Sequence, residues 1–579
     1  MDRPARPGPA WRPSPRRHPL ALAVTGAAAI VVSGVIALIN PGCLDLVVAS
    51  SNEKFELLSE IASSYQAPSV DRRCVKVQVI KKASGAAERA LARDWAGERQ
   101  PKPHVWSPGA TTWLLLLTED RKAAGLGELV PRVAQGIMQS PLVIAMPEQM
   151  ENALRQAEGT IGWEQIFGLA RDKNGWAKYG KPWGPFKLGK TDPTVSTSGL
   201  HALISVNNVA RETAAPDEFL TAVESSVVHY GDTVATFLSN LLIADQHGAA
   251  TDYVSAIAVE EKQVFDYNRG NPSSKLCRPD CPFLPPSEKL VAIDPTEGTL
   301  VADHPYAVLN WTDDARRQAA SDFKTHLESP AIQSLFRAEG FRDYRRQAGS
   351  GLVAPYFHPS GPKIRWEPPD PPDLVEMLDL WSTRLRKPAH ALFVIDIGSS
   401  MALSVPAESA TRLDLAKRAA SDALEHLALK DAVGLWTFPT TDAAPYREVA
   451  ALTSLASGTS QIAGGLGILS KASDEASFYA TVRESVDQVH ATFAADRINA
   501  VAVLTGERFA LADKNSFDRL ISYLQHQPES SRVRVFTIGY DPSSESVLRQ
   551  IAEASGGAFY DAYGPINIGE VLRNALSNF

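Results

Sequence analysis

The stretch Leu392-Phe-Val-Ile-Asp-Ile-Gly-Ser-Ser-Met401 decides the fold of the C-terminal part of this chain, because it leads an apolar strand directly into an aspartate and two serines. Open α/β sheets bind their ligands at the carboxyl ends of parallel strands. Mg²⁺ takes one or two carboxylates together with hydroxyls and waters. Asp396 and Ser400 are therefore candidate Mg²⁺ ligands at the end of a sheet strand.

Strands and helices alternate around this stretch. Expected strands cover 391–395, 433–438, 498–504, 533–538 and 558–561, and expected helices cover 412–429, 477–493, 516–526, 545–555 and 567–578, after a short helix at 374–385. This alternation predicts an α/β domain built as a doubly wound, Rossmann-like parallel sheet.

Residues 374–579 resemble a von Willebrand factor A domain. The matching stretches are Asp396-Ile-Gly-Ser-Ser400, Arg412-Leu-Asp-Leu-Ala-Lys417, Val433-Gly-Leu-Trp-Thr-Phe438, Arg497-Ile-Asn-Ala-Val-Ala-Val-Leu-Thr-Gly506 and Val533-Arg-Val-Phe-Thr-Ile-Gly-Tyr540. The resemblance implies a domain that engages a protein partner through a metal-ion-dependent adhesion site beginning D-x-S-x-S.

That adhesion site is degenerate in this sequence. Gly398 replaces the first serine, Ala476 stands where the loop threonine is expected, and Leu504-Thr505-Gly506 lacks the aspartate of the family's L-T-D-G motif. Two expectations stay open. Mg²⁺ binds Asp396 and Ser400 with help from Ser399, Ser477, Thr505 or Glu507, or the site is metal-free and backbone amides hold Asp396.

The region from 43 to 358 also has an α/β pattern, with strands expected at 44–49, 75–80 and 141–146 and helices at 53–65 and 86–95. Three helices are expected to start with hydroxylic residues: Ser50-Ser51-Asn52-Glu53, Ser84-Gly85 and Ser196-Thr197-Ser198-Gly199. Helix N-termini bind anions through free backbone N–H groups and the helix dipole. The serines could instead serve only as helix caps, but three such starts together favour a ligand cleft.

This region resembles the bacterial extracellular solute-binding proteins of the two-lobed periplasmic type. The matching stretches, in order, are Val47-Val-Ala-Ser-Ser-Asn-Glu-Lys54, Ser84-Gly85, Pro103-His-Val-Trp-Ser-Pro108, Ser140-Pro-Leu-Val-Ile-Ala-Met-Pro147, Gly189-Lys-Thr-Asp-Pro193, Ser196-Thr-Ser-Gly199 and Glu297-Gly-Thr-Leu300. The resemblance implies that the ligand-facing residues are Ser50, Ser51, Ser84, Trp106, Ser107, Thr191, Ser196, Thr197 and Ser198. Trp106 is equally compatible with a place in the core, and His104 stands where the family usually carries an acidic residue.

One segment matches a nucleotide-binding pattern by letters alone. Gly184-Pro-Phe-Lys-Leu-Gly-Lys-Thr191 fits G-x-x-x-x-G-K-[ST], but a P-loop needs a buried strand before it and a helix starting at the Lys-Thr. Lys181-Pro-Trp-Gly184 is no such strand, and Asp192-Pro193 disfavours a helix. A nucleotide site is therefore not expected.

The N-terminus predicts a membrane anchor. Five arginines in a Pro-rich leader, residues 1–18, precede an uncharged apolar run at 19–39, and about twenty apolar residues can span a bilayer. The positive-inside rule places the leader in the cytoplasm and the rest of the chain outside. The alternative is a lipoprotein anchored at Cys43.

All four cysteines follow this run, which suits disulfides in an oxidising compartment. Cys43 and Cys74 each precede an expected strand, so neighbouring strands would pair them, and the second expected pair is Cys277 with Cys281. A metal or redox pair is the alternative for Cys277-Arg-Pro-Asp-Cys281, but zinc would need two further ligands.

Six prolines between 359 and 372 predict an extended, semi-rigid linker, residues 359–373, between the two regions. The net charge of -8 gives no basic footprint for nucleic acid. No nucleophile elbow, H-E-x-x-H motif or clustered ligands indicate an enzyme.

The expected function is thus a membrane-anchored receptor or scaffold that binds a small polar or anionic solute and an unidentified protein. The alternatives are an adhesion or envelope-assembly protein with a vestigial cleft and, from residues 184–191, an extracytoplasmic nucleotide-dependent enzyme.

Overall fold

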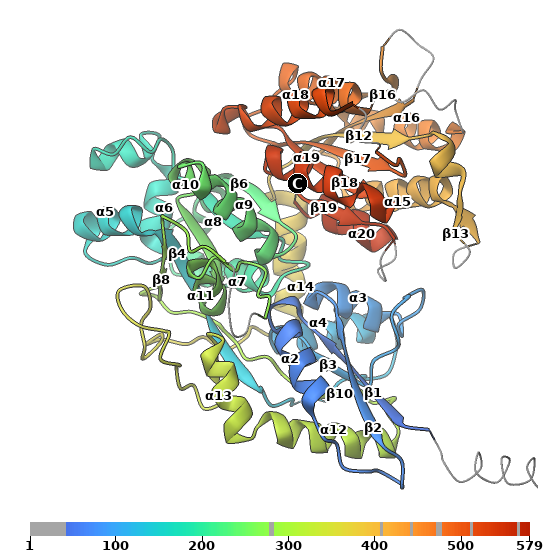
Figure 1. Ribbon diagram of the computed structural model, residues 1–579. Coiled ribbons are helices and arrows are strands. Elements are labelled where there is room, and N and C mark those ends of the chain that lie inside the picture. The colour runs from blue at the N-terminus through green and yellow to red at the C-terminus, as the bar shows by residue number, and fades with distance from the viewer. Residues whose placement is uncertain are drawn as a thin grey trace, which may run out of the picture.

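A computed structural model describes residues 42–131, 133–276, 283–405, 409–439, 444–470, 478–509, 513–563 and 568–578. These residues form two α/β lobes and a C-terminal α/β domain (Figure 1). The apolar run 19–39, Ala476, Ser477 and the pair Cys277 and Cys281 lie outside the described residues. Within the described ranges, no helix has the length and apolar character needed to cross a membrane.

Lobe 1 is built on the four-stranded sheet β10-β3-β1-β2, in which β1 and β2 pair in parallel. Its elements are β1 (Leu44–Ser50), β2 (Val75–Lys81), β3 (Val105–Ser107), β10 (Ala307–Val308), α2 (Asn52–Ser64), α3 (Ser84–Ala92), α4 (Thr112–Ala123), α12 (Asp314–Leu327) and α13 (Pro330–Ala338). A disulfide joins Cys43 to Cys74 next to the Leu44–Val75 register pair, which confirms the predicted pairing. Because the Cys43 sulfur is used in this bond, it is not free to carry a thioether-linked lipid.

Lobe 2 is built on the sheet path β11-β4-β7-β5-β6, with β8 and β9 also paired to β4. Its strands are β4 (Met138–Pro147), β5 (Leu188–Thr191), β6 (Val227–Gly231), β7 (Ala256–Glu260), β8 (Leu290–Ile293), β9 (Val301–Ala302) and β11 (Arg342–Asp343). Its helices are α5 (Glu148–Glu158), α6 (Trp163–Arg171), α7 (Thr197–Arg211), α8 (Pro216–Ser225), α9 (Val234–Gln246), α10 (Ala250–Tyr253) and α11 (Glu261–Asn268). Since β9 lies in lobe 2 and β10 in lobe 1, the chain crosses between the lobes at residues 303–306.

The C-terminal domain has a six-stranded sheet in the order β16-β15-β12-β17-β18-β19, flanked by helices (Figure 1). The strands are β12 (Ala389–Asp396), β15 (Ala432–Phe438), β16 (Arg447–Ser454), β17 (Ile498–Thr505), β18 (Arg534–Gly539) and β19 (Phe559–Asp561), and a small hairpin is formed by β13 (Ser404–Val405) and β14 (Ala410–Thr411). The helices are α15 (Arg412–His426), α16 (Leu455–Ile468), α17 (Phe478–Ala491), α18 (Lys514–Gln525), α19 (Glu545–Ser555) and α20 (Ile568–Leu576).

The prediction of a purely parallel sheet is wrong at one edge. Strand β16 pairs antiparallel with β15, and α16 follows it directly. Neither element was expected from the sequence, because β16 is half exposed and interrupted in register, and α16 contains four glycines that weaken its helical propensity. Apart from the short strands β13 and β14, which were also not expected, the strands and helices of this domain were predicted to within a few residues.

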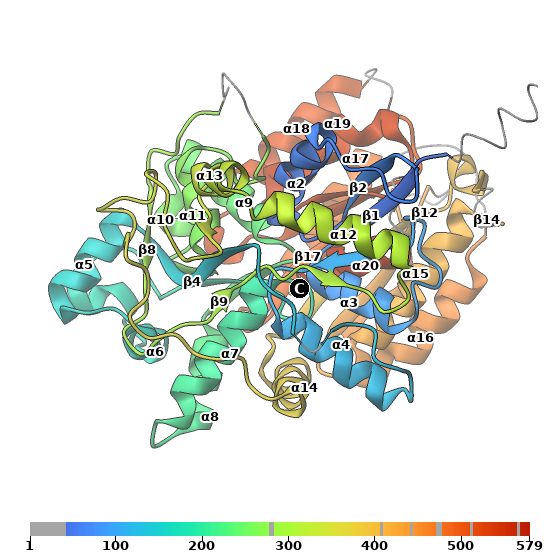
Figure 2. The same ribbon diagram turned by 90° about the horizontal axis from the view of Figure 1, so that it is seen from below.

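The Pro-rich linker is extended but does not hold the C-terminal domain away from the lobes. Its backbone is bound to lobe 2, since Trp366 N donates to Thr299 O (2.9 Å) and Thr299 N donates to Ile364 O (3.2 Å). The helix after it, α14 (Pro371–Leu380), contacts α4 of lobe 1 and α7 of lobe 2 and lies between them (Figure 2). The linker is therefore part of the packed molecule.

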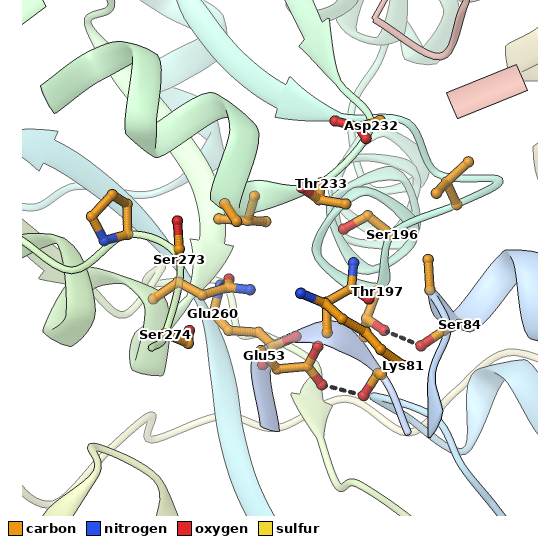
Figure 3. Close-up of a pocket in the computed structure, with 18 residues that line it drawn as sticks. Glu53, Lys81, Ser84, Ser196, Thr197, Asp232, Thr233, Glu260, Ser273 and Ser274 are labelled. Atoms are coloured by element: carbon orange, nitrogen blue, oxygen red, sulfur yellow. Dashed lines mark hydrogen bonds between the residues drawn. The ribbon is translucent and has the colours of Figure 1, made fainter. Parts of the chain in front are cut away.

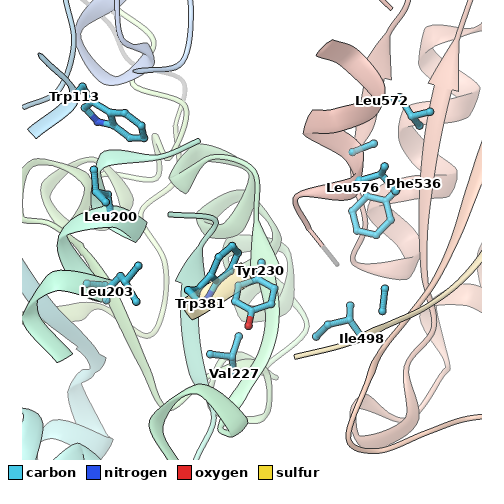
Figure 4. Packing of buried hydrophobic residues seen from close by; sticks show 14 of the residues in the cluster. Trp113, Leu200, Leu203, Val227, Tyr230, Trp381, Ile498, Phe536, Leu572 and Leu576 are labelled. Carbon is cyan, nitrogen blue, oxygen red and sulfur yellow. The ribbon is translucent and has the colours of Figure 1, made fainter. Parts of the chain in front are cut away.

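A buried polar cluster joins lobe 2 to the C-terminal domain. In the π-helical turn after α14, Trp381 is 2% exposed, and its Nε1 donates to Glu224 Oε1 (2.6 Å). Tyr230 donates its hydroxyl hydrogen to the same oxygen (2.6 Å), and Lys190 Nζ lies 2.6 Å from Glu224 Oε2. Lys387 N donates to the Tyr230 oxygen (3.0 Å). Figure 4 shows Trp381 and Tyr230 with the apolar side chains of this buried cluster.

We expect Trp381→Ala to lower the free energy of unfolding by about 3–5 kcal/mol, because it removes a buried indole and one hydrogen bond to a buried carboxylate. Calorimetry should resolve separate transitions for the lobes and the C-terminal domain in this variant. The control is Arg384→Ala, which breaks the exposed ion pair with Asp217 (2.7 Å) and should cost less than about 1 kcal/mol. Equal effects of the two substitutions would contradict this account of the junction.

Candidate functional site

A cavity of about 90 Å³ lies between the two lobes (Figure 3). Helices α2 and α3 from lobe 1 and α7, α9 and α11 from lobe 2 each contribute residues of their first turn or of the position just before it. Its lining residues are Ser51, Asn52, Glu53, Lys81, Ala83, Ser84, Val195, Ser196, Thr197, Asp232, Thr233, Val234, Ala235, Glu260, Gln263, Pro272, Ser273 and Ser274. Because the first amides of a helix lack intrahelical acceptors, this arrangement surrounds the cavity with hydrogen-bond donors.

The lobes touch directly beside the cavity. Gly85 N donates to Val195 O (3.1 Å), Arg89 Nη1 donates to Thr194 O (2.8 Å), and Thr197 donates its hydroxyl hydrogen to Ser84 Oγ (3.4 Å). A Cβ at position 85 would stand 2.0 Å from Thr194 O, so only glycine permits this approach. The cleft is therefore closed.

The structure brings four of the nine predicted ligand-facing residues to the cavity: Ser51, Ser84, Ser196 and Thr197. The other five are buried and do not line it: Ser50, Trp106, Ser107, Thr191 and Ser198. Trp106 belongs to the core, and Ser198 Oγ donates to Gln263 Oε1 (3.2 Å). His104 has a structural contact, because its Nδ1 accepts a hydrogen bond from Val47 N (3.0 Å).

Several lining residues were not predicted, among them Glu53, Lys81, Asp232, Thr233 and Glu260. Thr233 follows β6 and accepts from Thr236 N (3.2 Å) as the N-cap of α9, which is the same strand-then-cap pattern as at Ser51. That pattern was available in the sequence. The contribution of Glu260 was not, because it depends on how the two lobes meet.

A buried charged group lies under the cavity and joins the lobes. Lys54 is fully buried, and its Nζ donates to Pro108 O (2.9 Å) and lies 3.3 Å from His304 Nδ1. His304, in the crossing segment, faces Glu53 of lobe 1 (3.4 Å) and Glu260 of lobe 2 (3.6 Å) through its two ring nitrogens. Burial raises the pKa of Glu260, whereas at Glu53 it is outweighed by Lys54 and His304, which hold the pKa of Glu53 below its usual range.

Asp232 connects the cavity to the C-terminal domain. It begins the turn between β6 and α9, is 5% exposed, and its Oδ1 has no hydrogen-bond partner among the described residues. Its backbone N–H donates to Asn578 Oδ1 (3.2 Å), and Asn578 Nδ2 donates to the Tyr560 hydroxyl (2.7 Å). Burial raises the pKa of Asp232 to about 6, although hydrogen bonds from Thr236 and Thr233 oppose the shift.

The segment that matches the P-loop pattern does not have P-loop geometry. Leu188–Thr191 is strand β5, and α7 begins only at Thr197. Lys190 Nζ is buried against the carboxylate of Glu224 (2.6 Å) and cannot reach a nucleotide phosphate. The structure thus removes the basis for a nucleotide-dependent enzyme at this segment.

The candidate metal site lies at the carboxyl end of β12. Asp396 and Ser400 are close (Oδ2 to Oγ, 3.4 Å), but the carboxylate accepts hydrogen bonds from Gly398 N (2.8 Å), Thr505 Oγ1 (2.8 Å) and Gly506 N (3.1 Å). Arg412 Nη1 lies 3.4 Å from Ser400 O and donates weakly there.

This set of groups does not fit Mg²⁺. A Cβ at Gly398, where the family has serine, would stand 3.1 Å from Asp396 Oδ1. Over the ranges that the structure describes, no group of three His, Cys, Asp or Glu side chains is placed to hold a metal ion. The carboxylate oxygens of Asp396 that a metal would need thus already accept hydrogen bonds from the protein.

We therefore expect millimolar Mg²⁺ or EDTA to shift the melting temperature by less than about 1 °C, because a ligand stabilises only a state that it binds. Asp396→Ala should instead cost about 3 kcal/mol, since it leaves buried N–H and hydroxyl donors without an acceptor. Differential scanning fluorimetry and chemical denaturation measure the two effects. A clear Mg²⁺-dependent rise in the melting temperature that Asp396→Ala abolishes would contradict this expectation.

The raised pKa of Asp232 predicts a pH dependence of stability. The pKa of Asp232 is near 3.8 in the unfolded chain and about 6 in the folded protein, so the folded protein binds the proton more tightly. The contribution of Asp232 to the free energy of unfolding therefore falls as the pH rises from about 4 to about 6. Asp232→Asn should therefore exceed the parent in unfolding free energy at pH 7 by on the order of 1–3 kcal/mol and match it near pH 4.

Urea unfolding at a series of pH values makes this comparison. Asp217→Asn, at an exposed position in lobe 2 (77% side-chain exposure), is the control and should follow the parent. Parallel pH profiles for Asp232→Asn and the parent would show that burial of this carboxyl does not matter for stability.

Comparisons with known proteins agree with this architecture. The family model described as "Bacterial extracellular solute-binding protein" matches residues 46–342. No curated protein sequence matches the chain.

Among solved structures, the sulfate-binding protein SubI from Mycobacterium tuberculosis H37Rv is 13% identical, with 58% of this chain and 96% of that chain covered and a TM-score of 0.36. The periplasmic binding protein AfuA from Actinobacillus pleuropneumoniae is 13% identical, with 59% and 98% covered and a TM-score of 0.39. A von Willebrand factor type A structure from Catenulispora acidiphila is 17% identical, with 34% and 44% covered and a TM-score of 0.27.

The C-terminal part has von Willebrand factor A-like neighbours. The matched family region, residues 46–342, spans both lobes and more than half of the chain. The chain belongs to the bacterial extracellular solute-binding proteins.

Proposed function

We propose that this protein is a membrane-anchored, non-enzymatic receptor or scaffold outside the cytoplasm. In this proposal, residues 1–18 stay in the cytoplasm, residues 19–39 span the membrane once, and residues 43–358 bind a solute. The von Willebrand factor A-like domain, residues 374–579 after the linker 359–373, engages a protein partner. The family membership and the Cys43–Cys74 disulfide, which suits an oxidising compartment, support this placement.

The main support for the receptor proposal is that Asp232 contacts both the cavity and the C-terminal domain. Asp232 and Thr233 line the cavity, while the backbone of Asp232 is bonded to Asn578 of the C-terminal domain (3.2 Å). In helix α9, which follows Thr233, Asn240 Nδ2 donates to Gly556 O of the C-terminal domain (3.0 Å). A solute that moves the β6–α9 turn would therefore move a contact of the C-terminal domain. Signalling then passes through lobe 2 and not only through the Pro-rich linker.

The cavity favours a compact polar or anionic solute. Its volume of about 90 Å³ is far below the roughly 300–1,000 Å³ of pockets for drug-sized ligands. Helix amides and Lys81 donate hydrogen bonds to acceptor oxygens of the solute, and Asp232 offers an unmatched acceptor to a hydroxyl or other donor.

Native mass spectrometry of the full chain, purified gently without chelator, tests this proposal. The parent should carry a small-molecule mass, and the double variant Ser84→Ala, Thr197→Val should lose at least about tenfold in occupancy, because two cavity hydroxyls are gone. Ser205→Ala is the matched control, since Ser205 is buried in the same helix α7 but does not line the cavity. A ligand retained equally by the double variant would place its binding elsewhere.

The second candidate is an adhesion or envelope-assembly protein whose cleft is vestigial. The direct contacts across the cleft favour it, because Gly85 N reaches Val195 O and leaves little space. If this candidate is correct, the parent carries no small molecule, and the Ser84→Ala, Thr197→Val variant keeps its full biological activity.

A further inference from the structure

A second cavity, of about 240 Å³, lies where both lobes meet the linker, and none of the residues lining the interlobe cleft line it. Lobe 1 contributes Thr112, lobe 2 contributes Gln139 and His201, and the linker contributes Arg365. Arg346, from the segment before the linker, also lines the cavity. Only the docked linker brings these five residues together.

Two guanidinium groups line this cavity without a carboxylate partner. Arg365 Nη1 has one weak contact, with Gln139 Oε1 at 3.5 Å. Among the described residues, neither Arg346 nor Arg365 forms an ion pair within 4.0 Å. The lining also holds two acids, Asp303 and the exposed Glu367, and neither forms an ion pair with these arginines. The Asp303 carboxylate accepts hydrogen bonds from Thr111 N (2.7 Å) and Thr111 Oγ1 (2.6 Å).

The electrostatic field at Arg365 agrees with this geometry. Burial, followed by the positive charges of Arg346 and Arg342, lowers the pKa of Arg365, and the carboxylates of Asp294 and Glu261 oppose this shift. Arg342 itself is paired with Glu261 through two hydrogen bonds (2.7 and 2.8 Å), so it is not available to a ligand. Two guanidinium groups at one cavity, without an ion-pair partner within 4.0 Å among the described residues, are available to bind an anion.

His201 provides an independent sign of a ligand. The ring is 1% exposed, its Nε2 lies 3.3 Å from Thr112 Oγ1, and its Nδ1 has no hydrogen-bond partner in the described part of the chain. Burial lowers the pKa of His201 to about 3, so the ring is neutral and carries one N–H. When the Thr112 hydroxyl donates to Nε2, the hydrogen is on Nδ1, and a buried donor without an acceptor is costly.

We infer that this cavity, defined by Thr112, Gln139, His201, Arg346 and Arg365, is a second binding site for a small oxyanion such as phosphate or sulfate. The anion accepts hydrogen bonds from the two guanidinium groups and the imidazole. Because Arg365 belongs to the linker and His201 and Thr112 belong to opposite lobes, the bound anion joins all three parts. The site is also linked to the cleft, since Thr197 and His201 lie one turn apart on α7.

Calorimetric titration of the full chain with inorganic phosphate, and separately with sulfate, at matched ionic strength tests this site. The parent should bind with a dissociation constant below about 10 mM, and Arg346→Gln and Arg365→Gln should each weaken binding at least about tenfold. Arg345→Gln is the matched control, because Arg345 is exposed like its neighbour Arg346 but does not line the cavity. The cleft variant Ser84→Ala, Thr197→Val should still bind at this site.

A second measurement does not depend on the variants. Phosphate should slow hydrogen exchange in the parent's linker peptide that contains Trp366 N, because the anion fixes Arg365 beside it. Three results would overturn the inference: no heat of binding to the parent with either anion, equal weakening by Arg345→Gln, or loss of binding only in the cleft variant. Each of these leaves the test of the main cleft by native mass spectrometry unaffected.

Discussion

The buried carboxylate of Glu224 is the group on which the arrangement of this molecule depends. It accepts hydrogen bonds from Trp381 and Tyr230 and pairs with Lys190, so three elements that are far apart in the sequence meet at one residue. Burying a carboxylate is costly unless its lone pairs are used. Here they are used by lobe 2 itself and by the turn that leads into the C-terminal domain. Separation of the two parts would leave this charge without one of its donors, which favours a single packed body.

This junction changes how the two ends of the molecule can communicate. A flexible spacer would let the C-terminal domain move independently, whereas the structure binds the linker backbone to Thr299 and places α14 against both lobes. The β6–α9 turn then reaches the cleft on one side and Asn578 on the other. A single turn of the chain thus contacts both the cleft and the C-terminal domain.

Backbone amides have different roles at the cleft and at the edge of the C-terminal sheet. At the cleft, the first turns of five helices face the cavity, and their N-terminal ends favour an acceptor group of a solute. At Asp396, the amides of Gly398 and Gly506 donate hydrogen bonds to the carboxylate, and the Arg412 side chain lies close by. A donor that is already satisfied by the protein has little to offer to a ligand, and a carboxylate that is already satisfied has little to offer to a metal.

The sequence by itself determined the periodic elements and the family. Apolar strands that end in Asp396 or Ser50, followed by amphipathic helices, predict two α/β regions, and strands that begin at 44 and 75 predict the Cys43–Cys74 bond. These features depend on local patterns that are complete within a few residues. The half-exposed edge strand β16 and the glycine-containing α16 lack such a pattern, and so they were missed.

Only the tertiary structure decided which polar groups meet. Ser51, Ser84, Ser196 and Thr197 reach the cleft, but Ser50, Ser107, Thr191 and Ser198, with the same residue chemistry, turn into the protein interior. One position along a strand reverses the direction of a side chain, and a resemblance does not fix that direction. Glu260 depends on how the lobes meet, Asp232 on its contact with the C-terminal domain, and Arg365 on the docked linker. These parts are separated by long stretches of sequence. Their chemistry depends on burial and on neighbours that no local pattern specifies.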